Sequence, residues 1–218
     1  MSAAPHESGR VLRDRYEAAD LFSSDAVLSS SPDVLVASSQ QETIMTNDIR
    51  RTAEISACGL YRYWLEREWD GTKPALVVCM LNPSRGDADR DDPTIKTLIH
   101  FASLWGFGRL VIVNLYAWRA SRPEDMFLSA ERVGPENAAR LDGALGLAAS
   151  NGGKMLVAWG NDGGFERRDE QFSSRAAALG IDLICLGKTL SGAPKHPMAR
   201  GRGRIARDQM PLEWGARP

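Results

Sequence analysis

The stretch Ala-Leu-Val-Val-Cys-Met-Leu at residues 75–81, followed directly by Asn82-Pro83-Ser84, decides the fold. An apolar run of this length without polar alternation is typical of a strand that helices cover on both faces of a parallel sheet. The change to polar residues at Asn82 marks the carboxyl end of that strand. We therefore predict a buried parallel strand that opens into a polar loop.

Three further apolar runs of strand length follow, at residues 109–115, 154–159 and 181–186. Helical segments separate the runs, and the first opens at Asp92-Pro93-Thr94 with an acidic N-cap and a proline at the first helical position. Strands that alternate with helices imply right-handed crossovers. The predicted fold class is α/β, a three-layer α/β/α sandwich with a four-stranded parallel core sheet.

An N-terminal antiparallel edge ribbon is expected beside this core. Residues 60–65 are rich in aromatic side chains, and Asp70-Gly71 follows them, which predicts a ribbon with its turn at these two residues.

The ends of the chain differ from the core. Residues 1–44 are partly Ser-rich and lack a sustained period, so we expect them to be disordered or a gene-start artefact, with Met45 as the true start. The prediction is one α/β domain over residues 45–207 and a C-terminal tail over residues 208–218.

The composition excludes several classes of protein. The 218 residues carry 27 Lys and Arg against 28 Asp and Glu, so no global basic field favours non-specific binding to DNA or a membrane. Three widely spaced cysteines favour buried thiols in a reducing compartment over a disulfide framework or a zinc site. No apolar run could span a membrane, so we expect a cytoplasmic protein without a membrane partner. The sequence predicts no oligomeric state.

Polar residues gather directly after each predicted strand. Because ligands bind at the carboxyl edge of open parallel sheets, we expect these side chains to form one site. The candidate residues are Asn82, Pro83, Ser84, Asp92, Thr94, Asn114, Arg119, Trp159, Gly160, His196 and Pro197.

Each candidate also has a purely structural interpretation. Asn82 and Ser84 can hold a water or the polar edge of a ligand, or they can cap the backbone of a turn. His196 can donate to a substrate oxygen, transfer a proton, or only cap its loop. Trp159 can stack on a base or pack in the core.

Two charged segments are further candidates for ligand sites. Carboxylates at positions 87, 89, 91 and 92 begin like a calcium loop, but Asp92 and Leu98 stand where that loop needs Gly and Glu. We therefore predict a solvated or capping loop and assign no metal ligand, with a magnesium site as the lesser alternative. Basic residues cluster near the C-terminus and suit the phosphates of a nucleotide or nucleic acid, or form a solvated tail. The candidate phosphate-binding residues are Lys195, Arg200, Arg202 and Arg204.

Three common motifs are absent after the strands. No Gly-Lys-Ser/Thr phosphate loop, GxGxxG turn or Gly-x-Ser-x-Gly elbow occurs there, which argues against a P-loop NTPase, a dinucleotide-binding enzyme and an α/β-hydrolase. We expect no cofactor.

The chain resembles a bacterial and phage family known as domain of unknown function 1643. The resemblance extends over about residues 52–198, and it implies a shared fold but no activity. Its matching stretches include residues 58–63, 81–84 with 91–94, 113–120, 134–137, 158–160 and 192–197.

A more distant resemblance is to the uracil-DNA glycosylase superfamily, whose fold is an α/β/α sandwich with motifs at the strand ends. Leu81-Asn82-Pro83-Ser84 is similar to its first motif and Lys195-His196-Pro197 to its late His-Pro motif, although Ser84 and Met198 depart from the usual pattern. The resemblance implies that Asn82 positions the attacking water and that His196 supports charge on the departing base.

Three hypotheses of function follow. The first is a glycosylase-like hydrolase acting on a nucleobase in nucleic acid or in a nucleotide. The second is a non-catalytic nucleotide or nucleic-acid binding module that has the same pocket. The third is metal-assisted phosphoryl chemistry at the Asp87–Asp92 loop.

Overall fold

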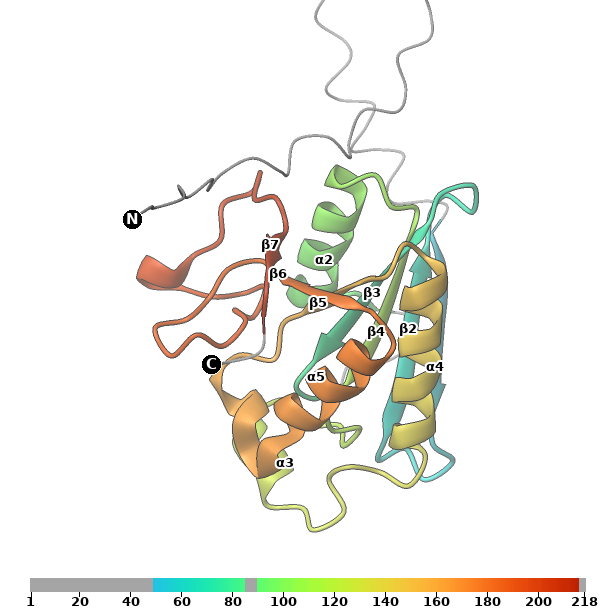
Figure 1. Cartoon of the computed structure of the whole chain (residues 1–218). Coiled ribbons are helices and arrows are strands. Elements are labelled where there is room, and N and C mark those ends of the chain that lie inside the picture. The colour runs from blue at the N-terminus through green and yellow to red at the C-terminus, as the bar shows by residue number, and fades with distance from the viewer. Residues whose placement is uncertain (1–48, 85–89, 216–218) are drawn as a thin grey trace, which may run out of the picture. The chain divides into compact units, whose positions relative to one another are not determined.

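The computed structural model describes residues 49–84 and 90–215 (Figure 1). The predicted disordered or artefactual segment 1–44, with the proposed start at Met45, lies outside these residues. The described ranges belong to one compact unit of the chain.

The described part of the chain forms one seven-stranded mixed sheet in the order β1-β2-β4-β3-β5-β6-β7. The strands β4, β3, β5 and β6 pair in parallel, whereas β1 with β2, β2 with β4, and β6 with β7 pair antiparallel. The bounds are β1 Arg50–Ile55, β2 Arg62–Glu68, β3 Ala75–Met80, β4 Arg109–Asn114, β5 Lys154–Val157, β6 Asp182–Cys185 and β7 Leu212–Glu213.

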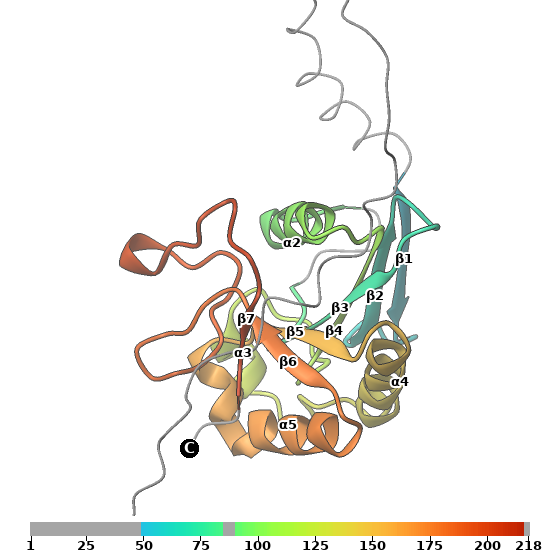
Figure 2. The same ribbon diagram turned by 45° about the horizontal axis from the view of Figure 1, so that its top comes forward.

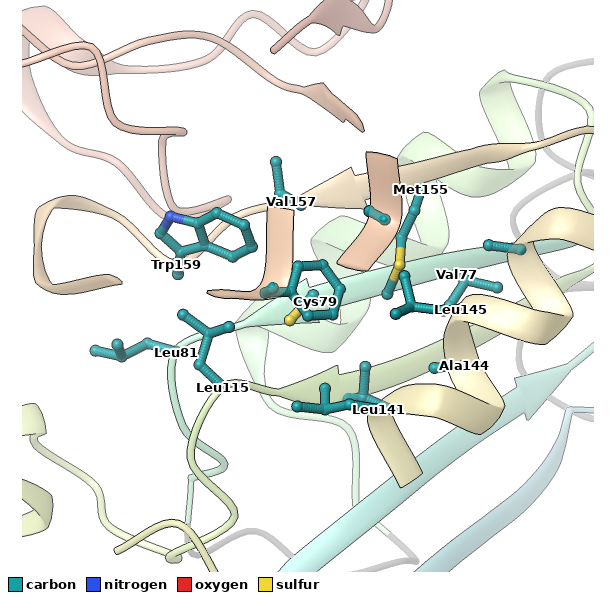
Figure 3. Close-up of a cluster of buried hydrophobic side chains, with 14 of the residues drawn as sticks. Val77, Cys79, Leu81, Leu115, Leu141, Ala144, Leu145, Met155, Val157 and Trp159 are labelled. Carbon is teal, nitrogen blue, oxygen red and sulfur yellow. The ribbon is translucent and has the colours of Figure 1, made fainter. Parts of the chain in front are cut away.

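Helices lie on both faces of this sheet (Figure 2). Alternate residues of β3 point to opposite faces, so Leu76 and Val78 pack with α2, while Val77 and Cys79 pack with α4 and α5. Figure 3 shows the second of these two cores. The helices are α2 Pro93–Leu104, α3 Pro123–Phe127, α4 Asn137–Ser150 and α5 Arg168–Ala178, with 3-10 turns η1 Asn161–Arg167 and η2 Gly201–Gly203.

The α/β class is confirmed, but the whole sheet is a mixed seven-stranded sheet and is larger than predicted. The sequence predicts a sandwich built on a four-stranded parallel core with one edge ribbon, whereas the sheet is mixed and carries antiparallel partners at both edges. The difference arises because residues 212–213, in the predicted C-terminal tail, add an antiparallel strand beside β6.

The turn of the edge ribbon is also misplaced in the prediction. The β1–β2 hairpin turns between Ser56 and Tyr61, whose backbone groups are joined by a 3.0 Å hydrogen bond from Ser56 N to Tyr61 O. Asp70 and Gly71 instead connect β2 to β3, and Asp70 accepts hydrogen bonds from the N–H and hydroxyl of Thr72. The Asp-Gly signal therefore marks a real turn that joins a different pair of strands.

A 3-10 turn comes between β5 and the helix that precedes β6. The η1 turn has a kink at Phe165 and Glu166, and α5 starts at Arg168. Among the described residues, no helix combines the length and the apolar character that crossing a membrane requires.

Candidate functional site

A cavity of about 520 Å³ opens at the carboxyl ends of the parallel strands. We call it the sheet-edge cavity. Its walls come from the loops after β3 and β5, the end of β4, the start of α2 and the segment after β6. The polar and aromatic residues that line it are Arg62, Asn82, Ser84, Asp92, Thr94, Asn114, Ser121, Trp159, Asp162, His196 and Arg200.

Asn82 is held in one orientation by the backbone. Its Nδ2 donates to the carbonyl oxygens of Pro83 at 3.2 Å and Ala120 at 3.0 Å. Both donors of the amide are thereby used, and Oδ1 accepts no hydrogen bond from the described residues. Asn82 therefore offers a fixed acceptor to a water or a ligand in the sheet-edge cavity.

Ser84 and Asp92 join the loop after β3 to the start of α2. The Ser84 hydroxyl donates to Asp92 Oδ2 at 3.0 Å, and Asp92 Oδ1 accepts from the backbone N–H of Ile95 at 2.9 Å. Asp92 is thus the N-cap of α2, as predicted from Asp92-Pro93-Thr94. Both of its carboxylate oxygens are engaged by the protein.

His196 presents a defined tautomer to the cavity. Its Nδ1 accepts from the backbone N–H of Met198 at 3.1 Å, so the neutral ring carries its proton on Nε2. Burial lowers the pKa of His196, and the negative charge of Asp92 opposes that shift. The ring is therefore a neutral donor near pH 7.

Asn114 is a buried amide at the end of β4. Only 2% of the residue is exposed, and its side chain makes no hydrogen bond with the described residues. The residue lines the sheet-edge cavity. An amide in this position offers one donor group and one acceptor to a ligand.

Trp159 is a wall of the cavity and part of the core. Its ring makes edge contacts with Phe172 and Trp214 at centroid distances of 5.8 and 5.2 Å. Gly163 packs so closely on the indole that an added Cβ would overlap with it. The indole is therefore locked in the core and leaves only part of its surface toward a ligand.

Several predicted residues lie outside the sheet-edge cavity. Pro83 accepts a backbone hydrogen bond from Ala120, and Arg119 donates to Gly59 O at 2.9 Å. Lys195 lies against Gly187, and Arg202 is exposed. Pro197, Arg200 and Arg204 line a second cavity, which Arg200 shares with the first.

Arg62 was not predicted as a site residue, although it is 4% exposed and lines the sheet-edge cavity from β2. Burial lowers its pKa to about 10, and the negative charge of Asp92 opposes this shift. The sequence signal that could have revealed this residue is its place between Tyr61 and Tyr63, in a strand rich in aromatic residues. A charged side chain in a buried strand needs a partner.

The carboxylates of the Asp87–Asp92 loop, predicted to be solvated or capping, have protein partners where they are described. Asp91 accepts from Arg67 Nε at 2.6 Å and from Arg51 at 3.3 Å, and Asp92 caps α2. Asp87 and Asp89 lie outside the described residues. Within residues 49–84 and 90–215, no group of three or more His, Cys, Asp or Glu side chains could hold a metal ion.

Comparison with known proteins gives one family. The family model described as "Protein of unknown function (DUF1643)" matches residues 62–198, which include every strand from β2 to β6 and most of the lining of the sheet-edge cavity. No curated protein and no solved structure matches the chain. The resemblance to uracil-DNA glycosylases therefore has no support from these comparisons.

Proposed function

The chain belongs to the family of unknown function DUF1643, and from the chemistry of its sheet-edge cavity we propose that it binds a nucleobase and hydrolyses the N-glycosidic bond of that base. The observation that carries the proposal is that Asn82, Asn114 and His196 line one cavity. Each has a polar side-chain group that no described residue uses, and hydrogen bonds to the backbone orient Asn82 and His196. The volume of about 520 Å³ suits a small heterocyclic ligand.

The base is held by its edge. Asn114 offers an amide donor and an amide acceptor, which together complement the adjacent C=O and N–H of a lactam such as uracil. The Nε2–H of His196 donates to a second base oxygen. Groups of this kind in one cavity favour a lactam base over a sugar or an aliphatic ligand.

Two side chains have separate roles in the proposed reaction. Asn82 Oδ1 orients a water toward the anomeric carbon, the C–N bond breaks, and its electron pair passes to the base. The Nε2–H of His196 stabilises the negative charge that develops on the departing base oxygen. The water oxygen then bonds to the anomeric carbon and releases a proton to solvent.

The proposed function also includes a fold assignment. A three-layer sandwich with motifs at its strand ends, similar to that of uracil-DNA glycosylases, would place an Asn-Pro loop and a His-Pro loop on one cavity. The positions of Asn82 and His196 on the same cavity support that assignment. A cytoplasmic location would suit the activity.

A second candidate is a binding module without hydrolysis. The observation that favours it is that both oxygens of Asp92 are already engaged, by Ser84 and by the N–H of Ile95. The cavity then lacks a free general base at this position, and a bound base could stay intact. We do not propose metal-assisted chemistry, because Asp91 and Asp92 already have protein partners.

The test is release of free base from oligonucleotides and nucleosides that carry uracil, thymine, hypoxanthine or cytosine, measured by chromatography. We expect release of a lactam base by the full chain and at least about a hundredfold loss in Asn82→Ala and His196→Ala. Ser121→Ala is the matched control, because Ser121 lines the same cavity and has no assigned role. Binding without release would select the second candidate, and neither binding nor release would refute both.

A further inference from the structure

A second cavity of about 670 Å³ lies beside the first, between α2 and the segment after β6. We call it the basic cavity. Figure 1 shows this red segment close to α2, and two hydrogen bonds join them, from Trp105 Nε1 to Gln209 O and between His100 Nε2 and Arg207 O. The lining residues that carry charge or can gain it are Lys96, His100, Arg200, Arg204 and Arg207.

The charge of the basic cavity has one sign. No Asp or Glu lines it, and the side chains of Lys96, Arg200, Arg204 and Arg207 make no ion pair within the described ranges. Elsewhere in these ranges many arginines are paired with carboxylates, as Arg67 is with Asp91 and Arg109 with Glu66. In a chain whose formal net charge is −1, a concave surface of cations that make no ion pair with another described residue is suited to an anion.

The two cavities share a wall. Met198 and Arg200 line both, and Thr97 of α2 contacts the Met198 sulfur at 3.3 Å. A ligand that occupies the sheet-edge cavity with a base therefore has the cations of the basic cavity within reach of the groups attached to that base. In a nucleic acid those groups are the sugar and its phosphodiesters.

We propose that the basic cavity holds phosphodiester groups of a single strand of nucleic acid whose neighbouring base occupies the sheet-edge cavity. This inference rests on the proposed function and narrows its substrate from a nucleobase in any form to a base in a strand. A single strand is favoured because an unpaired base enters the pocket without the free-energy cost of unpairing and unstacking a duplex. The cations contact the strand whatever its sequence.

The experiment measures binding of fluorescent uracil-containing oligonucleotides to the full chain by anisotropy over a salt series. The labelled probes are single-stranded DNA, single-stranded RNA and the matched DNA duplex, and uridine monophosphate and inorganic phosphate are added as unlabelled competitors. Lys96→Gln with Arg204→Gln removes two cations that line only the basic cavity. Arg202→Gln is the matched control, because Arg202 lies in the same segment and lines neither cavity.

We expect the double variant to bind a single strand at least about tenfold more weakly, with the salt slope reduced by about 0.7 for each phosphate that the protein no longer neutralises. Arg202→Gln should bind as the wild type does. The affinities for single-stranded DNA and single-stranded RNA show whether the protein prefers a strand of deoxyribose or of ribose. Equal affinity for the strand and for uridine monophosphate, tighter binding of the duplex, or an unchanged slope in the double variant would overturn the inference.

Base release from the same preparations separates this inference from the proposed function. If the double variant binds the strand more weakly but the wild type releases no base, the phosphate site is supported and hydrolysis is refuted. Base release by the wild type, with strand binding unchanged in the double variant, would refute the phosphate site alone.

Discussion

The Nδ1 of His196 accepts a hydrogen bond from the backbone N–H of Met198 at 3.1 Å, and this contact determines which ring nitrogen is free to donate. A ring that accepts through Nδ1 must carry its proton on Nε2 when it is neutral. His196 therefore enters the sheet-edge cavity as a donor, the role that the proposed reaction requires of it.

The stability of the chain should depend on the protonation of His196. Burial lowers its pKa, so the unfolded chain binds this proton more readily than the folded chain. The stability linked to His196 is therefore fully present above the ordinary pKa of 6.5 and is lost as the pH falls through the lower folded value. Urea unfolding between about pH 7 and pH 5 should show a steeper loss for the wild type than for His196→Gln. The prediction would be contradicted if the free energy of unfolding fell equally with pH in the wild type and in His196→Gln.

Two substitutions of Asn82 should distinguish the structural role of its Nδ2 group from the proposed catalytic role of its Oδ1 atom. Asn82→Asp replaces the donor that reaches the carbonyls of Pro83 and Ala120 with an oxygen that they repel. We expect a loss of about 1–3 kcal/mol in the free energy of unfolding, together with loss of base release. Asn82→Ala should abolish base release with a smaller loss of stability, because it leaves no repelled oxygen. Equal stability of both variants, measured by urea unfolding, would show that the amide is not held in this way.

The close contact between Gly163 and Trp159 should be sensitive to a single methyl group. The Cβ of Gly163→Ala would overlap with the indole ring, so Trp159 must shift and the wall of the sheet-edge cavity with it. We expect a loss of about 1–3 kcal/mol in stability and weaker binding of a nucleobase, measured by urea unfolding and calorimetry. Gly164→Ala is the control, since a Cβ there would lie 3.7 Å from Asp169 Oδ2, an ordinary contact distance. The same effect in both variants would refute the role of the close contact.

The buried ion pair of Arg67 and Asp91 should stabilise the fold more than an exposed pair does. The side chain of Arg67 is 0% exposed and that of Asp91 is 8% exposed. Asp91→Asn should cost about 3–5 kcal/mol, because it leaves a buried cation without its partner charge. Arg122 and Asp125, whose side chains are 73% and 37% exposed, provide the control, and Asp125→Asn should cost less than about 1 kcal/mol. Similar costs in the two variants, measured by urea unfolding, would contradict the assignment.

The strongest sequence signals were those that arise locally. The continuous apolar run before Asn82 correctly predicted β3, because burial on both faces removes polar alternation. The Asp92-Pro93 pair correctly predicted the start of α2, since N-cap chemistry depends on neighbouring residues alone. The expectation that polar strand ends meet placed Asn82, Asn114 and His196 together, and they line one cavity.

The features that the sequence did not reveal depend on distant contacts. Arg62 and Arg67 in β2 look like exposed positions of a ribbon until Asp91 and Asp92 are placed beside them. The strand β7 has two residues, which is too short for any periodic pattern, and it exists because Trp214 is buried against the core and donates to Gly192 O at 3.0 Å. The true hairpin turn, near Gly59 with its φ of 73°, was hidden because Asp70-Gly71 is the more common hairpin pattern.

The most direct test of the central claim is a crystal structure of the full chain with uracil bound. We predict electron density for the base in the sheet-edge cavity, with its lactam edge at hydrogen-bond distance from Asn114 and a base oxygen within about 3 Å of His196 Nε2. Uracil bound away from Asn82, Asn114 and His196, or His196 turned so that Nδ1 faces the base, would contradict the proposed binding mode.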